Sequence, residues 1–528
     1  MNTLATTKPK EREVTRRDWC AIFGGLMGGF MAILDIQITN SSMKVIQGAL
    51  SASLNDASWL MTAYFTAEIV AIPLCGWLAK AFGTGRYALW CIGGFLATSL
   101  LCAHAWSLNS MIVFRALQGF CGGALIPLSF RLIIEVLPEE KRPMGMSLFS
   151  IIATFAPAIG PALGGWLTEH LSWHAIFYIN ALPSIIAFTL ISRSMISPKI
   201  NWQVIRHGDF LGVLSVVLFL GCLEVVLEKG GQENWFDSQM ICVLSAISLI
   251  SFIVFVYDQI IAPHPLINIH LLTQRQYCHS LIIFAMFGSA IYGTLFLVPY
   301  YLTMIHDYSA SEIGHVVIWM GLPQLFILPI IPMLLRRYNP KYLIFIGFIG
   351  LAISAFMDCH MSNDFSGPQM IASMIVRAIG QPFIMVPLSV LATQNLRAED
   401  ATSSAVLINV FRSIGGSMGT ATLSTYFMTR IYFHLDMIKE SLSQGNPQLS
   451  HYLQQVKEIL ISHGQASDPT QVQQQALGIL GQRMAVQSQI IAFNDLFMVL
   501  GVMMLTTAIL VLFSNRDFKL TARQRGSL

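Results

Sequence analysis

The fold class follows from the stretch Gln239–Tyr257, which reads QMICVLSAISLISFIVFVY. It has no charged side chain, and as a helix it is long enough to cross the roughly 30 Å hydrocarbon core of a bilayer. The whole chain has this character, since 54% of its 528 residues are hydrophobic and only 11% are charged. Soluble proteins carry about 25% charged residues. We therefore predict an all-α polytopic membrane protein, because a membrane β-barrel would show alternating segments of about ten residues.

Apolar segments of similar length lie on both sides of this stretch and predict about fourteen membrane spans of roughly 17–27 residues. We place them near residues 19–43, 57–79, 87–106, 109–130, 145–168, 173–192, 209–228, 239–257, 278–304, 312–335, 342–359, 368–394, 402–427 and 490–513. The first span is too long for the apolar core of a cleaved signal peptide, so we expect it to be retained.

The basic residues predict the orientation of these spans. With the N-terminus inside the cell, about 22 of the 31 Lys and Arg residues fall in cytoplasmic segments. About six fall outside, including Lys44 and Lys229 in short loops and four in the long loop 428–489. Cytoplasmic segments of membrane proteins carry an excess of Lys and Arg, so we predict that both termini are cytoplasmic. A net charge of +3 gives no reason to expect a nucleic-acid partner.

The sequence has no pattern typical of an enzyme or a metal site. It lacks an HExxH motif, a Walker-type phosphate loop and paired His or Cys ligands. Its nine cysteines mostly fall in or beside apolar spans, where they act as small apolar side chains rather than as a disulfide framework. We therefore predict no enzymatic activity, no metal and no cofactor.

A few ionisable residues lie within the predicted spans, where a charge costs at least about 2.5–3.5 kcal/mol on insertion scales. The deepest are Asp35, Glu68, Arg115, Glu224, Arg377 and Arg412. They either form a path for protons or substrate, or pair to hold helices together. A carboxyl group in an apolar cavity can bind and release a proton near neutral pH, because burial disfavours its charged form. Glu228 lies one helical turn beyond Glu224 near the outer end of its span, where we expect it to be solvated.

Seven segments in order resemble the signatures of a known transporter family. They are Asp35–Asn40, Gly76–Arg86, Arg115–Gly119, Gly160–Gly165, Trp173–Asn180, Glu228–Ser238 and Arg412–Ser417. Their order and spacing are similar to those of the major facilitator superfamily, specifically the fourteen-span drug:proton antiporters typified by EmrB and QacA. The chain departs from the family pattern at Lys80, usually acidic, at His174, usually arginine, and at Glu68, where many members have a neutral polar residue.

The resemblance implies a fold of two six-helix bundles with two helices inserted between them. On this chain it predicts a cytoplasmic N-tail, an N-terminal bundle, linkers with the inserted helices, a C-terminal bundle that includes the outer loop 428–489, and a cytoplasmic C-tail. The corresponding ranges are 1–18, 19–192, 193–277, 278–513 and 514–528.

The resemblance also implies a function, namely proton-coupled efflux of drugs or other amphipathic toxic compounds by alternating access, with the proton gradient as energy source. The proton-coupling candidates are Asp35, Glu68, Arg115 and Glu224. The glycines and proline of the antiporter motif, expected to form a close and deformable helix contact, are Gly160, Pro161, Gly164 and Gly165. Aromatic or polarisable residues that could line the substrate cavity are Tyr64, Phe65, Tyr292, Tyr300, Tyr301, Phe383 and Met385.

The expected surroundings are the bacterial inner membrane, a small amphipathic substrate and the lipid bilayer. Loop 428–489 has apolar residues at helical spacing, and Asp468-Pro469 predicts a helix start. By resemblance this loop could bind a periplasmic adaptor protein that leads to an outer-membrane channel, or it could be a solvated hairpin with no partner. Two alternatives to drug efflux remain open, a dedicated exporter of one endogenous metabolite such as a fatty acid or siderophore, and a transport-inactive membrane sensor or scaffold.

Overall fold

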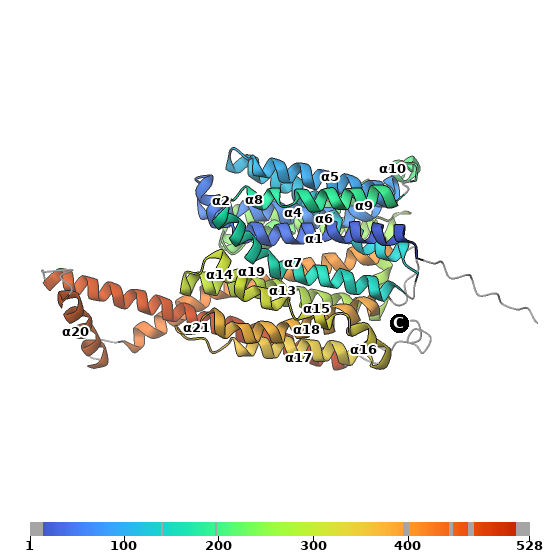
Figure 1. The fold of residues 1–528 in the computed structure, drawn as a ribbon. Coiled ribbons are helices and arrows are strands. Elements are labelled where there is room, and N and C mark those ends of the chain that lie inside the picture. The colour runs from blue at the N-terminus through green and yellow to red at the C-terminus, as the bar shows by residue number, and fades with distance from the viewer. Residues whose placement is uncertain are drawn as a thin grey trace, which may run out of the picture.

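The computed structural model describes residues 14–138, 141–195, 198–263, 265–393, 401–442, 447–462 and 469–513. All regular elements in these ranges are helices, as predicted (Figure 1). The first half holds α1 (Arg16–Ser41), α2 (Met43–Ala49), α3 (Leu54–Ala57), α4 (Trp59–Phe82), α5 (Thr84–Ala103), α6 (Leu108–Val136), α7 (Arg142–His170), α8 (Ala175–Tyr178), α9 (Ala181–Ser194), α10 (Trp202–Arg206), α11 (Phe210–Lys229) and α12 (Gln239–Ile261). The second half holds α13 (Arg275–His306), α14 (Ala310–Val317), α15 (Gln324–Ile327), α16 (Ile331–Arg337), α17 (Pro340–Met357), α18 (Gly367–Thr393), α19 (Ala401–Ser441), α20 (Pro447–Ser462) and α21 (Pro469–Phe513). Short 3₁₀ turns are η2 (Trp235–Asp237), η3 (Ile269–Thr273) and η4 (Ile318–Met320).

The span count agrees with the sequence analysis. Within the described ranges, 13 helical segments are long and apolar enough to cross a membrane. The remaining predicted span, 402–427, belongs to α19, which packs against α4, α13 and α21. Because α19 is surrounded by other helices, it does not need a continuous apolar face toward lipid, and its Gly, Ser and Thr residues serve helix packing instead. The chain is therefore a multi-pass helical membrane protein.

The predicted span 312–335 is not one regular helix. It is divided into α14, η4, α15 and α16, with irregular turns between them. Pro323, Pro329 and Pro332 lie in this region, and proline removes a backbone donor and clashes with the preceding helical turn. Three prolines within ten residues therefore interrupt a segment whose hydropathy alone predicts a straight span.

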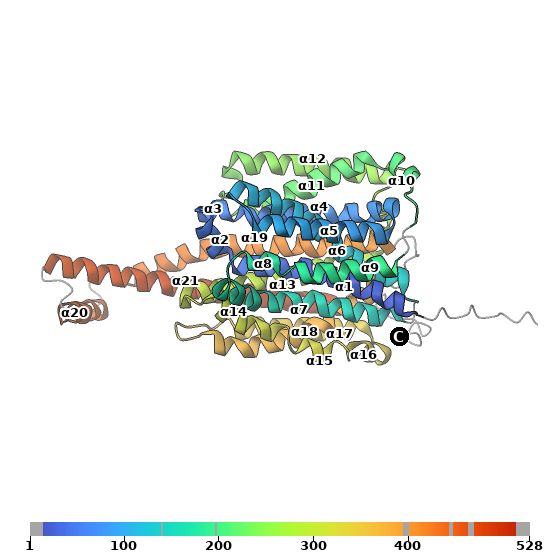
Figure 2. The same ribbon diagram turned by 45° about the horizontal axis from the view of Figure 1, so that its top comes forward.

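The helices pack in two groups. The first group consists of α1, α4, α5, α6, α7 and α9, and the second of α13 to α19 together with α21. α7 packs against α14, and α4 packs against α19, so these pairs join the groups. α11 pairs with α12 along one side of the molecule and also packs on α4 and α19 (Figure 2). The division into two bundles that move as units stays a prediction.

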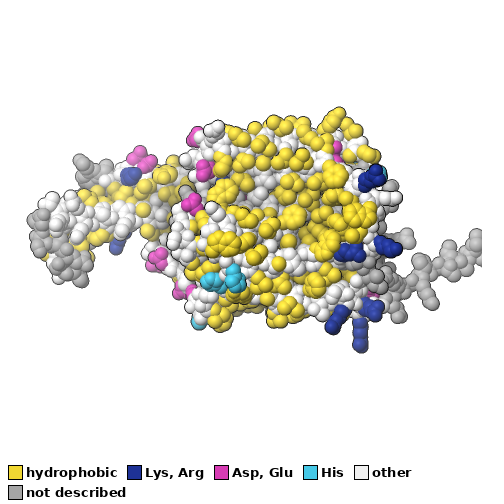
Figure 3. Space-filling model, turned by 90° about the horizontal axis from the view of Figure 1, so that it is seen from above, with side chains coloured by type: hydrophobic (Ala, Val, Ile, Leu, Met, Phe, Trp, Pro, Cys, Tyr) yellow, Lys and Arg dark blue, Asp and Glu magenta, His cyan; other side chains and the backbone are white. Residues whose placement is uncertain are grey.

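The molecule has two distinct ends. At one end α19 and α21 project far beyond the other helices, and α20 connects with them there (Figure 1). We call these projecting parts the extension. The end of the molecule from which they project is the extension end. Lys and Arg side chains gather at the opposite end, which we call the basic end, while the side between them is largely hydrophobic (Figure 3). α1 begins and α21 finishes at the basic end.

The extension is held together by a small apolar cluster of its own. Val456 and Leu460 of α20 pack against Val472 and Ala476 of α21. As the Asp468-Pro469 pair predicts, α21 begins at Pro469, and it continues without a break into the last span. Because one helix runs from the extension into the membrane-spanning part, the extension is rigidly connected to the second group.

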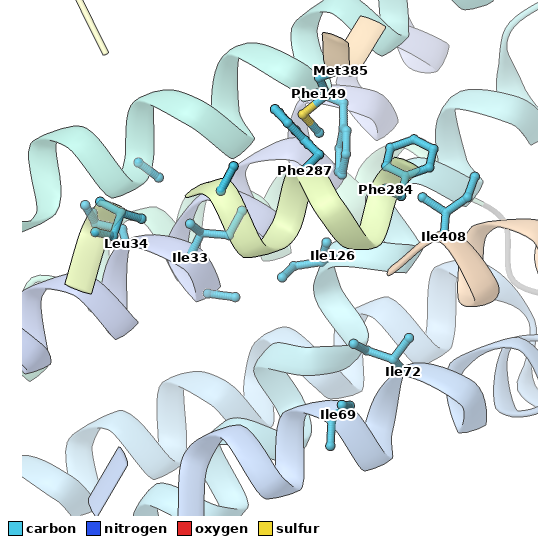
Figure 4. Packing of buried hydrophobic residues seen from close by; sticks show 14 of the residues in the cluster. Ile33, Leu34, Ile69, Ile72, Ile126, Phe149, Phe284, Phe287, Met385 and Ile408 are labelled. Atoms are coloured by element: carbon cyan, nitrogen blue, oxygen red, sulfur yellow. The ribbon is translucent and has the colours of Figure 1, made fainter. Parts of the chain in front are cut away.

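Apolar side chains fill the interior toward the basic end. Phe149 of α7 and Met385 of α18 point toward Phe287 of α13, while Phe284 lies beside Ile408 of α19 (Figure 4). These residues come from both groups of helices. They make a tight apolar contact between the groups in the half of the molecule near the basic end.

Candidate functional site

A cavity of about 450 Å³ lies between the two groups, in the half nearer the extension end. Its volume is within the range of roughly 300–1,000 Å³ that is typical of small-molecule sites. Its walls come from α1, α4, α11, α13 and α19, and the residues that line it are Ile36, Gln37, Asn40, Met61, Phe65, Glu68, Ile69, Glu224, Leu227, Glu228, Gly231, Gln232, Tyr292, Leu295, Phe296, Tyr300, Ser413, Gly416, Ser417, Thr420, Ala421, Ser424 and Met428.

Three glutamates contribute acidic groups to this cavity. Glu68 comes from α4, and Glu224 and Glu228 come from successive turns of α11. Glu68 is 9% exposed and Glu224 is 3% exposed. The Ser417 hydroxyl on α19 donates to Glu224 Oε1 at 2.7 Å, whereas Glu224 Oε2 has no hydrogen-bond partner among the described residues. The cavity wall thus contains a buried carboxyl group with one oxygen that forms no hydrogen bond to the described residues.

Aromatic side chains form another wall. Tyr292, Phe296 and Tyr300 follow one another at intervals of four along α13, so they lie on one face of that helix. The rings of Phe296 and Tyr300 stack with centroids 5.3 Å apart. Phe65 of α4 adds a further ring. The cavity therefore joins acidic groups to an aromatic surface that can contact apolar or cationic ligands.

Glycines in the two helix pairs around the cavity set the positions of these side chains. Gly119 and Gly123 of α6 lie directly against the backbone of Tyr64 and Glu68, where a Cβ atom would clash. Gly415 of α19 lies against the backbone of Ala285 on α13 in the same way. Small residues allow membrane helices to approach closely. The Arg115–Gly119 segment therefore allows α6 to pack closely on α4, and the Arg412–Ser417 segment allows α19 to pack closely on α13. These contacts fix the positions from which Glu68 and Tyr292 reach the cavity.

Asp35 and Arg115, two of the proton-coupling candidates, form a buried ion pair outside the cavity wall. Arg115 Nη1 lies 2.5 Å from Asp35 Oδ2, and both residues are at most 1% exposed. Asp35 Oδ1 also accepts hydrogen bonds from Gln118 at 3.0 Å and Asn180 at 2.6 Å. The Arg115 guanidinium lies over the Tyr64 ring, 4.3 Å from its centroid. This network joins α1, α4, α6 and the turn before α9 within the first group.

The structure brings only some of the predicted cavity residues together. Phe65, Tyr292 and Tyr300 line the cavity, whereas Tyr64 is buried behind it against Arg115. Tyr301 points away and donates to the Phe365 carbonyl at 2.7 Å. The other two candidates lie on α18, where Phe383 packs against one apolar cluster and Met385 belongs to the apolar contact near the basic end.

The antiporter-motif glycines place α7 between α1 and α14. A Cβ atom on Gly160 would meet Gln37, and one on Gly164 would meet Ile38 and Ser41, all on α1. A Cβ atom on Gly165 would meet the backbone of Ala310 and Ser311 at the start of α14. Pro161 lies inside α7 between these contacts. The motif thus allows close contact within the first group on one side and between the groups on the other.

The two other arginines within the spans lie in the second group. Arg377 of α18 is buried, and its Nη2 lies 3.9 Å from Oδ2 of Asp358. Asp358 directly follows the end of α17. Arg412 donates to Asn409 at 3.2 Å and lies close enough to Glu68 for their charges to attract. Arg412 therefore offsets the charge of Glu68, while Arg377 belongs to a separate polar cluster.

One expectation about α11 was wrong, and another was incomplete. Glu228 is partly exposed, and it also lines the cavity beside Glu224. Lys229, assigned to a loop, is the last residue of α11 and is 2% exposed; it donates to Ser58 and lies over the Trp59 ring, 4.8 Å from its centroid. The spacing of four between Glu224 and Glu228 places them on one face, and this is the signal that could have identified Glu228. Ser417 ends the Arg412–Ser417 signature segment, but no local spacing indicates its contact with Glu224, because that contact depends on how α19 packs against α11.

Comparison with known proteins gives the family of the chain. The sequence profile of the Major Facilitator Superfamily matches residues 25–420. The chain is 30% identical over 501 residues to the colistin resistance protein EmrB of Acinetobacter baumannii, covering 95% of this chain and 97% of that protein. It is 28% identical over 495 residues to the multidrug export protein EmrB of Escherichia coli, covering 93% and 94%. It is 27% identical over 489 residues to the fatty acid resistance protein FarB of Neisseria gonorrhoeae, covering 91% and 92%. The chain therefore belongs to the Major Facilitator Superfamily, a family of membrane transporters rather than enzymes, and to its EmrB/QacA-like members.

Proposed function

We propose that the protein is a proton-coupled exporter that moves amphipathic toxic compounds out of the bacterial cytoplasm by alternating access. The observation that carries this proposal is the cavity of about 450 Å³ between the two groups of helices, which combines buried glutamates with an aromatic wall. A transporter of this type needs one central site that both a proton and a substrate can reach. Relatives named for multidrug export and colistin resistance support an exporter of toxic compounds.

Glu68 and Glu224 are the best placed groups to carry the proton. Both are buried and line the cavity, so each can exchange a proton with the same space that a substrate enters. Asp35 is instead held by Arg115, Gln118 and Asn180 away from the cavity wall. We propose that the Asp35–Arg115 pair positions α4 and α6, and that proton exchange occurs at the cavity glutamates.

The proposed orientation has the basic end in the cytoplasm of the bacterial inner membrane. The gathering of Lys and Arg at that end supports it, since cytoplasmic ends carry the basic excess (Figure 3). In this orientation the cavity faces the outer side, and the apolar contact around Phe287 separates it from the cytoplasm (Figure 4). The two groups would rock so that this contact opens while the outer half closes.

Among the narrower alternatives, similarity to FarB favours a fatty acid exporter. The acidic lining of the cavity favours the broader proposal, because three glutamates would repel a carboxylate substrate. We further propose that the extension is the surface that an adaptor protein contacts in the periplasm. It projects from the outer end in the proposed orientation, and α20 packs against α21 near its tip (Figure 1).

The decisive experiment is transport by the purified protein in liposomes with an imposed pH gradient, using a panel of cationic, neutral and anionic amphipathic compounds. We expect movement of at least one compound against its own gradient, coupled to proton flux in the opposite direction. Glu68→Gln should abolish the coupling. A complete absence of gradient-driven transport for every compound, with correctly folded protein, would favour the sensor or scaffold alternative.

A further inference from the structure

The wall of the cavity formed by α11 belongs to neither group of helices. α11 pairs with α12 beside the two groups, and from there Glu224, Leu227 and Glu228 reach the cavity. The contact between Glu224 and Ser417 joins α11 to α19 directly. A helix that only filled space between the groups would have no need for two carboxylates facing a cavity, since each is costly in a membrane.

Among the described residues, no basic side chain forms an ion pair with Glu224. The charged groups that act on Glu224 within the described part of the chain are Glu228 and Glu68, which are also acidic. Arg412 acts on Glu68, and Lys229 acts on Glu228 while donating to Ser58 on α4. Glu224 is 3% exposed and no described residue hydrogen-bonds its Oε2, so it is the acidic group in the cavity that most needs a positive partner.

The aromatic wall of the cavity can bind the uncharged part of a ligand whose positive group pairs with Glu224. Tyr292, Phe296 and Tyr300 present aromatic faces along α13, and Phe65 does so from α4. Aromatic faces bind both apolar groups and delocalised or quaternary cations. A ligand that carries one positive charge on an apolar, partly aromatic body matches both walls at once.

We propose that α11 determines the charge selectivity of the cavity: Glu224 and Glu228 bind the positive group of an amphipathic organic cation whose apolar body lies against the α13 aromatic face. This inference rests on the proposed function for its physiological meaning, but the binding it describes does not depend on proton coupling. It assigns to the first of the two inserted helices a part of the substrate site.

The test compares two probes of the same shape and opposite charge, tetraphenylphosphonium and tetraphenylborate. Their binding is measured to the full-length protein in lipid nanodiscs, with empty nanodiscs to subtract partition into lipid. We expect the cation to bind at least about tenfold more tightly than the anion, because the glutamates attract one and repel the other. Glu224→Gln should reduce this preference by about tenfold, and Glu228→Gln should reduce it less, because Lys229 already acts on Glu228.

Glu233→Gln is the matched control, since it removes one negative charge from the turn after α11 at an exposed position that does not line the cavity. It should leave the preference unchanged. Glu224→Asp keeps the charge and should keep most of the preference, which separates charge recognition from a packing defect. If Glu224→Gln fails to fold, the Glu228→Gln and Glu224→Asp variants decide the question.

Equal binding of the two probes by the unaltered protein would overturn the inference, and so would full cation preference in folded Glu224→Gln. The proposed function fails differently. If a pH gradient drives no transport while cation binding still depends on Glu224, proton-coupled export is wrong and the role of α11 stands. If transport is coupled to protons but substitution of Glu224 and Glu228 changes the binding of cations and anions equally, the proposed function stands and the role of α11 in charge selectivity is wrong.

Discussion

At the scale of single residues, the charged groups within the membrane-spanning part divide into two kinds. Asp35 and Arg115 satisfy one another within a network that includes Gln118 and Asn180. Glu224 instead faces a cavity, and one of its oxygens has no hydrogen-bond partner in the part of the chain that the structure describes. A paired buried charge holds structure in place, because its partner depends on it, whereas an unpaired one next to open space is available to protons and ligands.

Asp35→Asn should therefore destabilise the protein strongly. The change leaves the Arg115 charge buried without its counter-charge, and breaking a buried pair in this way costs about 3–5 kcal/mol. Thermal unfolding of the purified protein, followed by tryptophan fluorescence, would show a clear fall in Tm.

The matched control is Asp436→Asn, which breaks the ion pair with Lys439 at the extension. Both partners are more than half exposed, so this pair contributes at most about 1 kcal/mol and Tm should hardly change. An equal, small effect of the two substitutions would show that the Asp35 network does not hold the first group together.

At the scale of elements, small residues decide which helices approach closely. α7 contacts α1 through Gly160 and Gly164 and contacts α14 through Gly165. The α7–α14 contact is one of the contacts between the two groups, and α14 lies near the extension end (Figure 1). Any relative movement of the groups must therefore change the surroundings of Gly165.

Gly165→Val should impair transport. Its side chain would be forced into the backbone of Ala310 and Ser311, and overpacking of this kind costs about 1–3 kcal/mol. We expect a lower Tm together with slower transport in liposomes. Gly93→Val on α5 is the control, because no atom of the described residues lies within 4 Å of the added Cβ position there. Similar behaviour of the two variants would contradict a role for the α7–α14 contact.

The extension gives a second prediction at this scale. α20 packs on α21 outside the bundle of spans, so replacing α20 with a short Gly-Ser linker should leave transport in liposomes unchanged. If the extension binds an adaptor protein, export from intact cells should fall several-fold at the same expression level. Full export from cells by the shortened protein would exclude adaptor binding at α20.

At the scale of the whole molecule, the structure has a cavity toward one end and a closed apolar contact toward the other. The proposed alternating access requires the cavity to open at the other end while the apolar contact moves to this one, so it predicts that the rim of the cavity changes its width. Gly231, just after α11, lies on this rim opposite Ser424 of α19. A Cβ atom on Gly231 would be 3.5 Å from Ser424 Oγ.

A disulfide between Gly231→Cys and Ser424→Cys should therefore stop transport. The two positions are close enough to be joined, and a covalent link would prevent α11 and α19 from moving apart. We expect oxidation to block transport in liposomes and a reductant to restore it. Each single variant, oxidised in the same way, controls for the nine native cysteines. Undiminished transport by the fully cross-linked protein would show that the rim does not move during the cycle.

Sequence alone predicts that this is a membrane protein, and it predicts the approximate positions of the spans. It also identifies the ionisable residues whose placement within a membrane costs free energy. Long apolar runs such as Gln239–Tyr257 can be stable only in lipid or a large apolar interior, and this preference is local to each segment. The same reasoning identifies Asp35, Glu68, Arg115 and Glu224 as residues that need a specific reason to be present. It does not predict that residues 312–335 are divided into several short helices, because hydropathy does not register the effect of three prolines on backbone geometry.

Only the tertiary structure decides which of these residues act together. Asp35 and Arg115 are 80 positions apart, and Glu224 and Ser417 are 193 apart, so no local pattern connects them. Whether a membrane-embedded side chain meets a partner, a cavity or lipid depends on the rotation and packing of its helix, and these are set by close contacts such as Gly123 against Glu68. The sequence thus determines where ionisable residues lie within the spans, and helix packing determines that Asp35 is paired while Glu224 faces the cavity.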